Sequence, residues 1–281
     1  MAGTLSPRSA QLGAVRLAFS VSSQREASLI LLHGGSRTRL GADLIDRVDS
    51  RWQCWAPDLR GHGDSSHTPG HYALDEVAAD VALLIQEVVG SPSAVYGHSF
   101  GGHVGLVLAA DWPHLVRALI LGDTPLSLET LAPHIERNRR MTSKWRELAA
   151  SGASAAEITR QLHAIPEVVN AVGSDSPYYE AMGASLARHD PDFLDSVLER
   201  LNVSHGRLKG GAILSQIRCP VLLIRGDPAC GGVVDETDLR LATQYLSSCE
   251  VVSLVGVGHS LEDPVQLASA INRFLGHFLG A

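Results

Sequence analysis

Short apolar runs recur along this chain, and stretches with helical spacing separate most of them. The runs that predict strands are residues 15–21, 28–32, 52–56, the run that starts at Ala94, 118–121, 221–224 and 250–255. Several of these runs, such as 28–32, are continuously apolar instead of alternating between apolar and polar residues. Continuous runs are expected in strands whose sheet is covered on both faces.

The stretches between the strands have the spacing of amphipathic helices. Asp75 is placed to cap one of them, residues 76–89, in which Val77, Val81, Leu84, Ile85 and Val88 share one face. Further helices are expected at residues 41–48, 102–110, 235–246 and 264–279. The alternation of strands and helices predicts an α/β fold, a doubly wound and mostly parallel sheet.

The alternation stops at Pro125 and resumes near residue 221. The residues between contain no convincing strand and are interrupted by proline and glycine, for example at Ile165-Pro166. We therefore expect two parts: a core formed by residues 1–125 and 215–281, and a helical cap inserted as residues 126–214.

Composition narrows the classes of partner and the compartment. The chain has 281 residues, of which 45% are hydrophobic, and its formal net charge is −7. A negative chain without a broad basic face is a poor match for nucleic acid or an anionic membrane, so we expect neither as a partner. Its four cysteines show no C-x-x-C spacing, and no apolar signal segment or membrane span is evident. These features predict a cytoplasmic protein and leave the oligomeric state open.

The most distinctive motif lies where the strand that starts at Ala94 meets the next helix. Gly97 and Gly101 stand two residues before and after Ser99, which forms the pattern G-x-S-x-G. In such a nucleophile elbow, a strained turn exposes the serine oxygen beside a helix N-terminus. Side chains at the two glycine positions would collide with neighbouring backbone.

Two further polar residues follow later strands. Asp227 comes directly after Gly226, beyond the strand at 221–224, and His259 follows Gly258, beyond the strand at 250–255. Because the carboxyl ends of parallel strands line one edge of a sheet, Ser99, Asp227 and His259 can converge there. A histidine can take the serine proton, and a carboxylate behind it holds the required tautomer. These residues are the expected catalytic triad.

The segment His33-Gly34-Gly35 completes this set with an expected oxyanion hole. The backbone N–H groups of Gly35 and of Phe100, the residue after the serine, would donate to negative charge that develops on a substrate carbonyl.

Together these motifs resemble those of α/β-hydrolases that carry a helical cap. The resemblance rests on His33-Gly34-Gly35, the loop 58–65, the elbow around Ser99 and Gly258-His259, in this order along the chain. It implies that Ser99 is the nucleophile and His259 the base, that Gly35 and Phe100 are the oxyanion donors, and that neither a metal nor an organic cofactor is needed.

One position departs from the family pattern. Members usually carry the acid three residues after the glycine that ends the strand, and that position holds Ala229 here. Asp227 remains the first choice for the acid. Asp123, at the end of the strand 118–121, is the alternative, because some relatives carry their acid there.

The expected activity is hydrolysis of an ester, thioester or lactone of a small to medium acyl compound through an acyl-enzyme. Cleavage of a carbon–carbon bond in a β-diketone-like substrate is an alternative for the same residues, and a receptor that only binds a ligand in the pocket is another. Asp58, Arg60 and His62 are interpreted as a structural loop and His98 as a packing residue. Candidate pocket residues in the cap are Met141, Trp145, His163, Tyr178, Tyr179, Met182 and Phe193.

Overall fold

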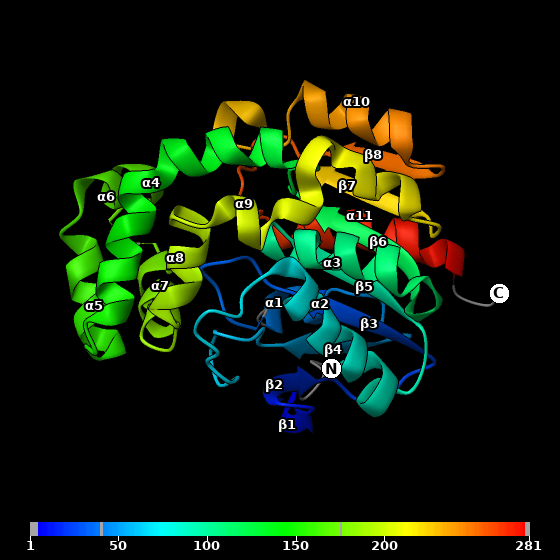
Figure 1. The fold of residues 1–281 in the computed structure, drawn as a ribbon, viewed down its shortest axis with the longest axis horizontal. Coiled ribbons are helices and arrows are strands. Elements are labelled where there is room, and N and C mark those ends of the chain that lie inside the picture. Colours follow the sequence, from blue (N-terminus) through cyan, green and yellow to red (C-terminus); the bar gives the residue numbers. More distant parts are fainter. Residues whose placement is uncertain (1–4, 40–41, 175, 279–281) are drawn as a thin grey trace.

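A twisted eight-stranded sheet runs through the centre of the molecule (Figure 1). The computed structural model describes residues 5–39, 42–174 and 176–278. The strands are β1 (Ser6–Leu12), β2 (Val15–Val21), β3 (Ala27–Leu32), β4 (Trp52–Pro57), β5 (Ser93–His98), β6 (Val116–Gly122), β7 (Val221–Arg225) and β8 (Cys249–Ser253). They are arranged in the order β1-β2-β4-β3-β5-β6-β7-β8, and all pairs from β4 to β8 are parallel. The predicted mostly parallel α/β sheet is therefore confirmed.

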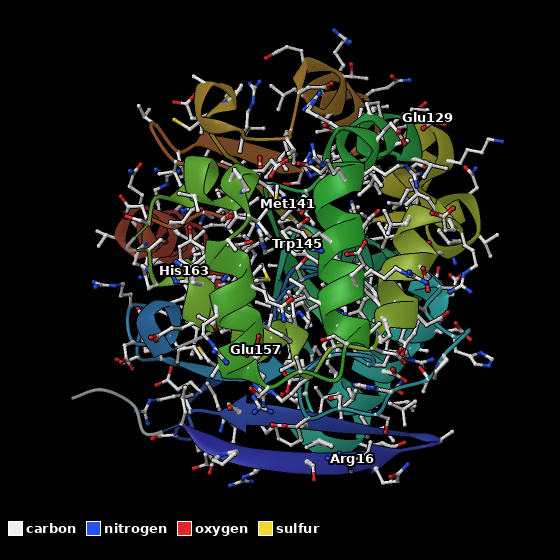
Figure 2. The ribbon with its side chains drawn as sticks, turned by 90° about the vertical axis from the view of Figure 1, so that its left-hand side faces the viewer. Arg16, Glu129, Met141, Trp145, Glu157 and His163 are labelled. Atoms are coloured by element: carbon white, nitrogen blue, oxygen red, sulfur yellow. The ribbon has the colours of Figure 1, made fainter. Side chains whose placement is uncertain are left out.

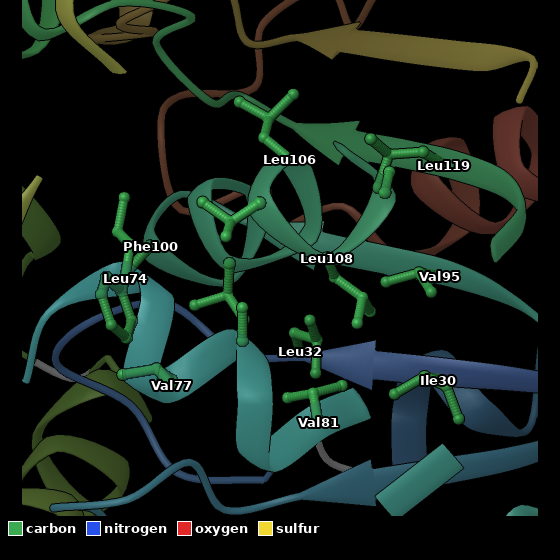
Figure 3. Packing of buried hydrophobic residues seen from close by; sticks show 14 of the residues in the cluster. Ile30, Leu32, Leu74, Val77, Val81, Val95, Phe100, Leu106, Leu108 and Leu119 are labelled. Atoms are coloured by element: carbon green, nitrogen blue, oxygen red, sulfur yellow. The ribbon is translucent and has the colours of Figure 1, made fainter. Parts of the chain in front are cut away.

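The sheet is buried on both faces, which explains its continuously apolar strands. In β3, Ile30 and Leu32 point into one core, and Leu29 and Leu31 point into the other. The first core also holds α2 (Leu74–Leu83) and α3 (Phe100–Asp111), whose side chains pack on β3, β5 and β6 (Figure 3). The second core holds α1 (Ala42–Ile45) and α11 (Pro264–Leu275). Alternate side chains of a strand thus face opposite helical layers.

A long helical segment separates β6 from β7 in the chain, although these two strands are neighbours in the sheet. It consists of α4 (Leu128–Ala150), α5 (Ala155–His163), α6 (Pro166–Val172), α7 (Tyr178–Leu186), α8 (Pro191–Leu198), α9 (Leu201–Ser204) and the 3-10 segment η3 (Gly206–Gln216). The described residues between β6 and β7 contain helices and loops but no strand. We refer to α4–α9 as the α4–α9 segment.

The α4–α9 segment lies beyond one edge of the sheet and has an apolar cluster of its own (Figure 1). Leu148 of α4, Ile158 and Leu162 of α5, and Met182 and Leu186 of α7 are buried in this cluster. Figure 2 looks onto this side of the molecule, with Met141 and Trp145 along α4 and Glu157 and His163 on α5. Its separation as a cap domain remains a prediction.

Several boundaries differ from those expected. The edge strand β1 was not predicted, because most of its side chains are exposed and its sequence SPRSAQL has no apolar alternation. The predicted helix at 76–89 begins at Leu74 and finishes as a π-helical turn, η1 (Leu84–Val89). The first predicted helix, 41–48, contains only the four residues of α1, and Gly41 lies outside the described residues.

The strand at 250–255 ends earlier than predicted, at Ser253, and α10 (Glu236–Tyr245) begins after its cap, Asp235. The last predicted helix ends at Leu275 and continues as the 3-10 turn η5 (Gly276–Phe278), while Leu279 lies outside the described residues. Among the helices in the described ranges, none combines the length and the apolar character that crossing a bilayer requires.

Candidate active site

Ser99 occupies the tight turn between β5 and α3, in a conformation that L-residues seldom adopt. Its φ is +51° and its ψ is −112°. A Cβ on Gly97 would lie 2.2 Å from the Gly101 carbonyl oxygen, and a Cβ on Gly101 would lie 2.5 Å from the Leu32 carbonyl oxygen. Both positions therefore require glycine, and the Ser99 N–H is tied to the Gly122 carbonyl at 2.9 Å. Local strain of this kind is typical of functional turns.

His259 brings Ser99 and a carboxylate into one line of hydrogen bonds. Its Nε2 lies 3.2 Å from the Ser99 Oγ, and its Nδ1 lies 2.7 Å from Oδ2 of Asp123. With the buried carboxylate as acceptor, Nδ1 carries the proton and Nε2 can accept the serine hydroxyl. This arrangement would allow His259 to take the Ser99 proton while Asp123 holds the imidazole in place.

The Asp123 carboxylate is fully buried, and several donors stabilise its charge. The backbone N–H groups of Gly226 and Val233 each donate to it at 2.9 Å, and that of Val234 lies at 3.4 Å. Burial acts to raise the pKa of Asp123, but the hydrogen bond and charge of His259 and the backbone donors outweigh it, so the pKa lies below its ordinary value. Asp123 is therefore ionised at neutral pH.

Among the described residues, no hydrogen bond or ion pair joins Asp227 to His259, so its predicted place behind that histidine is wrong. Its Oδ1 accepts the Ala229 N–H and its Oδ2 accepts the Gly256 N–H, both at 2.9 Å. These two backbone donors hold the carboxylate against the loops after β7 and β8. The alternative carboxylate, Asp123, occupies the position that was expected for Asp227.

The Gly34–Gly35 peptide lies beside the elbow and is held by a buried histidine. The Nδ1 of His33 lies 2.9 Å from the Gly34 carbonyl oxygen, and the Leu59 N–H donates to its Nε2 at 3.0 Å. His33 is thus the Nδ1–H tautomer and donates to the peptide whose nitrogen belongs to Gly35. In the described part of the chain, neither the Gly35 N–H nor the Phe100 N–H donates to another residue.

Two more buried histidines contact the same turn, and the sequence had not predicted this contact for either of them. His62 and His189 direct Nε2 at the Gly35 carbonyl oxygen, at 3.1 and 2.9 Å. The centroids of their rings are 4.3 Å apart, and burial lowers the pKa of both. His189 lies between α7 and α8, so only the fold brings it to this turn.

His98 lies inside the elbow but makes no hydrogen bond to Ser99. Its Nε2 donates to the His259 carbonyl at 2.7 Å, and burial, with the charge of His259, lowers its pKa to about 3. His98 therefore stays neutral and supports the backbone of the His259 loop. The loop residues Asp58 and Arg60 bind elsewhere: Asp58 accepts from the Arg39 N–H, and Arg60 forms a buried ion pair with Asp80.

A cavity of about 420 Å³ opens at Ser99, between the sheet edge and the α4–α9 segment. A volume of this order suits a small ligand. Five of the seven candidate pocket residues line it, namely Met141, Trp145, Tyr178, Met182 and Phe193. The other two, His163 and Tyr179, stack on each other with centroids 3.7 Å apart and do not line the cavity.

Polar groups in this cavity come from both sides, and sequence reasoning missed several of them. His134 of α4 faces the His259 ring at 5.2 Å between centroids, and its Nδ1 lies 3.3 Å from the Asn138 amide nitrogen. Burial lowers the pKa of His134 to about 4, so it is neutral. Arg37, two residues after Gly35, also lines the cavity. Across the described ranges, no group of three or more His, Cys, Asp or Glu residues is arranged to hold a metal ion.

Comparisons with known proteins place the chain in one family. The model of the alpha/beta hydrolase family matches residues 29–270. A segment of the chain is 39% identical over 87 residues to the magnesium-chelatase 30 kDa subunit of Rhodobacter capsulatus. The matched segment covers 30% of this chain and 31% of that protein. Another is 39% identical over 92 residues to a pimeloyl-[acyl-carrier protein] methyl ester esterase of Neisseria meningitidis, with 32% of this chain and 34% of that protein covered. The matched segments thus span only about a third of either relative.

Solved structures extend the similarity over the whole fold. A thermophilic esterase from Thermogutta terrifontis superimposes with a TM-score of 0.72 at 19% identity, covering 97% of this chain and 98% of that one. At this identity the similarity concerns the fold.

Proposed function

The chain belongs to the alpha/beta hydrolase family, and we propose that it is a serine hydrolase that cleaves an ester, thioester or lactone of a small to medium acyl compound. The observation that carries this proposal is the line of hydrogen bonds from Ser99 through His259 to Asp123. A receptor without turnover has no need of a serine, a base and a buried acid in this order. The similarity to an esterase supports the same class of reaction.

In this proposal the nucleophile is Ser99, the base His259 and the acid Asp123. His259 Nε2 takes the hydroxyl proton while Ser99 Oγ forms a bond to the substrate carbonyl carbon. Asp123 accepts the Nδ1 hydrogen bond and stabilises the imidazolium that forms. The bond to the leaving atom, oxygen in an ester or lactone and sulfur in a thioester, then breaks, and His259 returns the proton to that atom. An acyl-enzyme remains on Ser99.

Water completes the reaction by the same route. His259 takes a proton from the water, whose oxygen attacks the acyl carbon, and the proton then returns to Ser99 as the acid product leaves. In both steps the carbonyl oxygen becomes negative and is stabilised by the N–H groups of Gly35 and Phe100. Losing one such donor typically lowers turnover by about 10²–10³-fold.

We also propose that residues 126–214 act as a cap that closes the cavity over Ser99. Met141 and Trp145 of α4, Met182 of α7 and Phe193 of α8 line the cavity opposite the sheet edge. Apolar side chains in this position exclude water and bind the acyl group. Substrate selection then lies mainly in this part of the chain.

The test is covalent labelling together with turnover of short p-nitrophenyl esters. A fluorophosphonate should label Ser99 and abolish esterase activity, and Ser99→Ala should lose both labelling and turnover. Ser247→Ala is the matched control, because Ser247 is exposed in the loop before β8, and it should keep both. Labelling at another serine, or full activity in Ser99→Ala, contradicts the proposal. Turnover of a β-diketone but of no ester would favour carbon–carbon bond cleavage.

A further inference from the structure

The lining of the Ser99 cavity has a charge opposite to that of the whole chain. The formal net charge of the chain is −7. Within the described part of the chain, however, the residues that line the cavity include Arg37 and Arg137 and no Asp or Glu. Its only potential positive charges besides these two come from histidines. Such a lining attracts anionic ligands, because it contains positive charge and no carboxylate that would repel them.

The two arginines differ in their surroundings. Arg137 is exposed on α4, where solvent and salt screen its charge. Arg37 is half-buried, and its backbone N–H donates to the Gly34 carbonyl oxygen at 3.0 Å. The backbone of Arg37 is thus tied to the turn that carries the Gly35 N–H, and its side chain lines the same cavity as Ser99.

The Arg37 guanidinium faces an aromatic ring instead of a carboxylate. Its Cζ lies 5.2 Å from the centroid of the Tyr178 ring, which lines the same cavity from α7. Among the described residues, none offers a carboxylate oxygen within 4.0 Å of Arg37, although most other arginines of the chain have one, for example Arg39 and Arg60. The ring holds the cation in place but accepts none of its N–H groups as a carboxylate would.

We propose that Arg37 binds a carboxylate of the substrate, so that the preferred substrate is an anionic ester such as the half-ester of a dicarboxylic acid. This inference rests on the proposed hydrolase function and names its substrate class. A guanidinium offers two parallel N–H groups to a carboxylate, which fixes the direction as well as the position of the ligand. The carboxylate can lie on the acyl side or on the alcohol side of the scissile bond.

The experiment compares matched esters with and without a carboxylate. Mono-p-nitrophenyl adipate and p-nitrophenyl hexanoate have acyl chains of equal length, so they test the acyl side. The butyrate ester of 4-hydroxybenzoate and phenyl butyrate test the alcohol side. The wild-type enzyme should have a higher kcat/KM, by about 10-fold or more, for the charged member of at least one pair.

Substitution of Arg37 should remove this preference without removing hydrolysis. Arg37→Gln should lower kcat/KM for the preferred anionic ester by about 10–100-fold, the range of a hydrogen bond to a charged group. Its kcat/KM for the neutral ester should stay near the wild-type value, and Arg37→Lys should lie between the two. Arg240→Gln, which removes an exposed arginine of α10, should behave as wild type toward all four esters.

A binding measurement makes the result independent of turnover. Ser99→Ala should bind free adipate by calorimetry, and addition of Arg37→Gln to this variant should weaken binding about 10-fold or more. Equal kcat/KM for both members of each pair, an equal loss for charged and neutral esters in Arg37→Gln, or a loss confined to Arg137→Gln would overturn the inference. If no ester is turned over and no fluorophosphonate labels Ser99, the proposed function itself fails, while adipate binding still reports on Arg37.

Discussion

The ends of β6 and β7 carry the same dipeptide, glycine followed by aspartate, but place the two carboxylates in different surroundings. Asp123 has a φ of +40°, is fully buried and directs Oδ2 at His259. Asp227 has a φ of −70°, is partly exposed and caps the short 3-10 turn that follows it. The same dipeptide at the ends of two neighbouring parallel strands, Gly122-Asp123 at β6 and Gly226-Asp227 directly after β7, therefore places its aspartate in a different backbone conformation and a different degree of burial.

The difference shows that position at the catalytic edge of a sheet does not make an aspartate part of a site. At the end of β6, the left-handed backbone turns the carboxylate towards the loops that follow β7 and β8, where Gly226, Val233 and His259 donate to it. At the end of β7, the extended backbone leaves the carboxylate to the N–H groups of Ala229 and Gly256. One aspartate is hydrogen-bonded to His259, and the other connects two loops.

The largest expected effect is that of Asp123→Asn on turnover. Asparagine keeps the shape, but its amide can donate to Nδ1 of His259 and favour the tautomer that carries the proton on Nε2. That tautomer cannot accept the Ser99 proton, so kcat for a p-nitrophenyl ester should fall by up to about 10⁴-fold. The measurement is steady-state kinetics at neutral pH, with circular dichroism to show that the variant is folded. A kcat near the wild-type value would show that Asp123 is not the catalytic acid.

An intermediate effect concerns the pH dependence of stability at the β6 end. His103 is buried, donates Nε2–H to the Pro125 carbonyl at 3.0 Å, and burial lowers its pKa to about 4. In the unfolded chain the pKa of a histidine is about 6.5, so between these values the unfolded state binds more protons and stability falls as the pH decreases. His103→Gln should make this decline shallower by up to about 1.4 kcal/mol per pH unit.

Urea unfolding of wild type and His103→Gln at pH 7 and pH 5 measures the slope. Gln can still donate to the Pro125 carbonyl, which makes it the appropriate replacement. Part of the slope should persist in the variant, because burial also lowers the pKa of His33 to about 4. Parallel slopes for the two proteins would show that His103 does not contribute to the acid sensitivity of this region.

The smallest expected effect is that of Asp227→Asn. The hydrogen bonds from Gly256 and Ala229 lower the pKa of Asp227, so its contribution to stability is present above its unfolded pKa of about 4 and is lost as the pH falls through the folded value. The variant should therefore have a slightly lower Tm than wild type at pH 7, the difference should shrink as the pH falls below about 4, and kcat should stay close to wild type. A loss of kcat as large as that of Asp123→Asn would contradict the assignment of different roles to Asp123 and Asp227.

Much of the fold was predictable from the sequence, because its determinants are local. The apolar runs of β3, β5, β6 and β7 indicated a sheet covered on both faces, and the glycines around Ser99 indicated a turn in which no side chain fits. The polar edge strand β1 escaped prediction, because it is stabilised by pairing with β2 along its whole length and not by burial of an apolar face. Backbone pairing between strands does not require particular residue types in an exposed strand, so the sequence gives little indication of it.

The sequence by itself identified Ser99, His259 and Gly35 as candidate site residues, because each belongs to a short motif that follows a strand. Only the tertiary structure decided which Gly-Asp pair faces His259, since the choice depends on backbone dihedral angles and on donors that lie more than one hundred residues away in the chain. The same holds for Arg37 and Tyr178, which meet in the cavity although no motif contains both. Contacts between distant segments arise from packing, and residue types alone do not encode which donor meets which carboxylate.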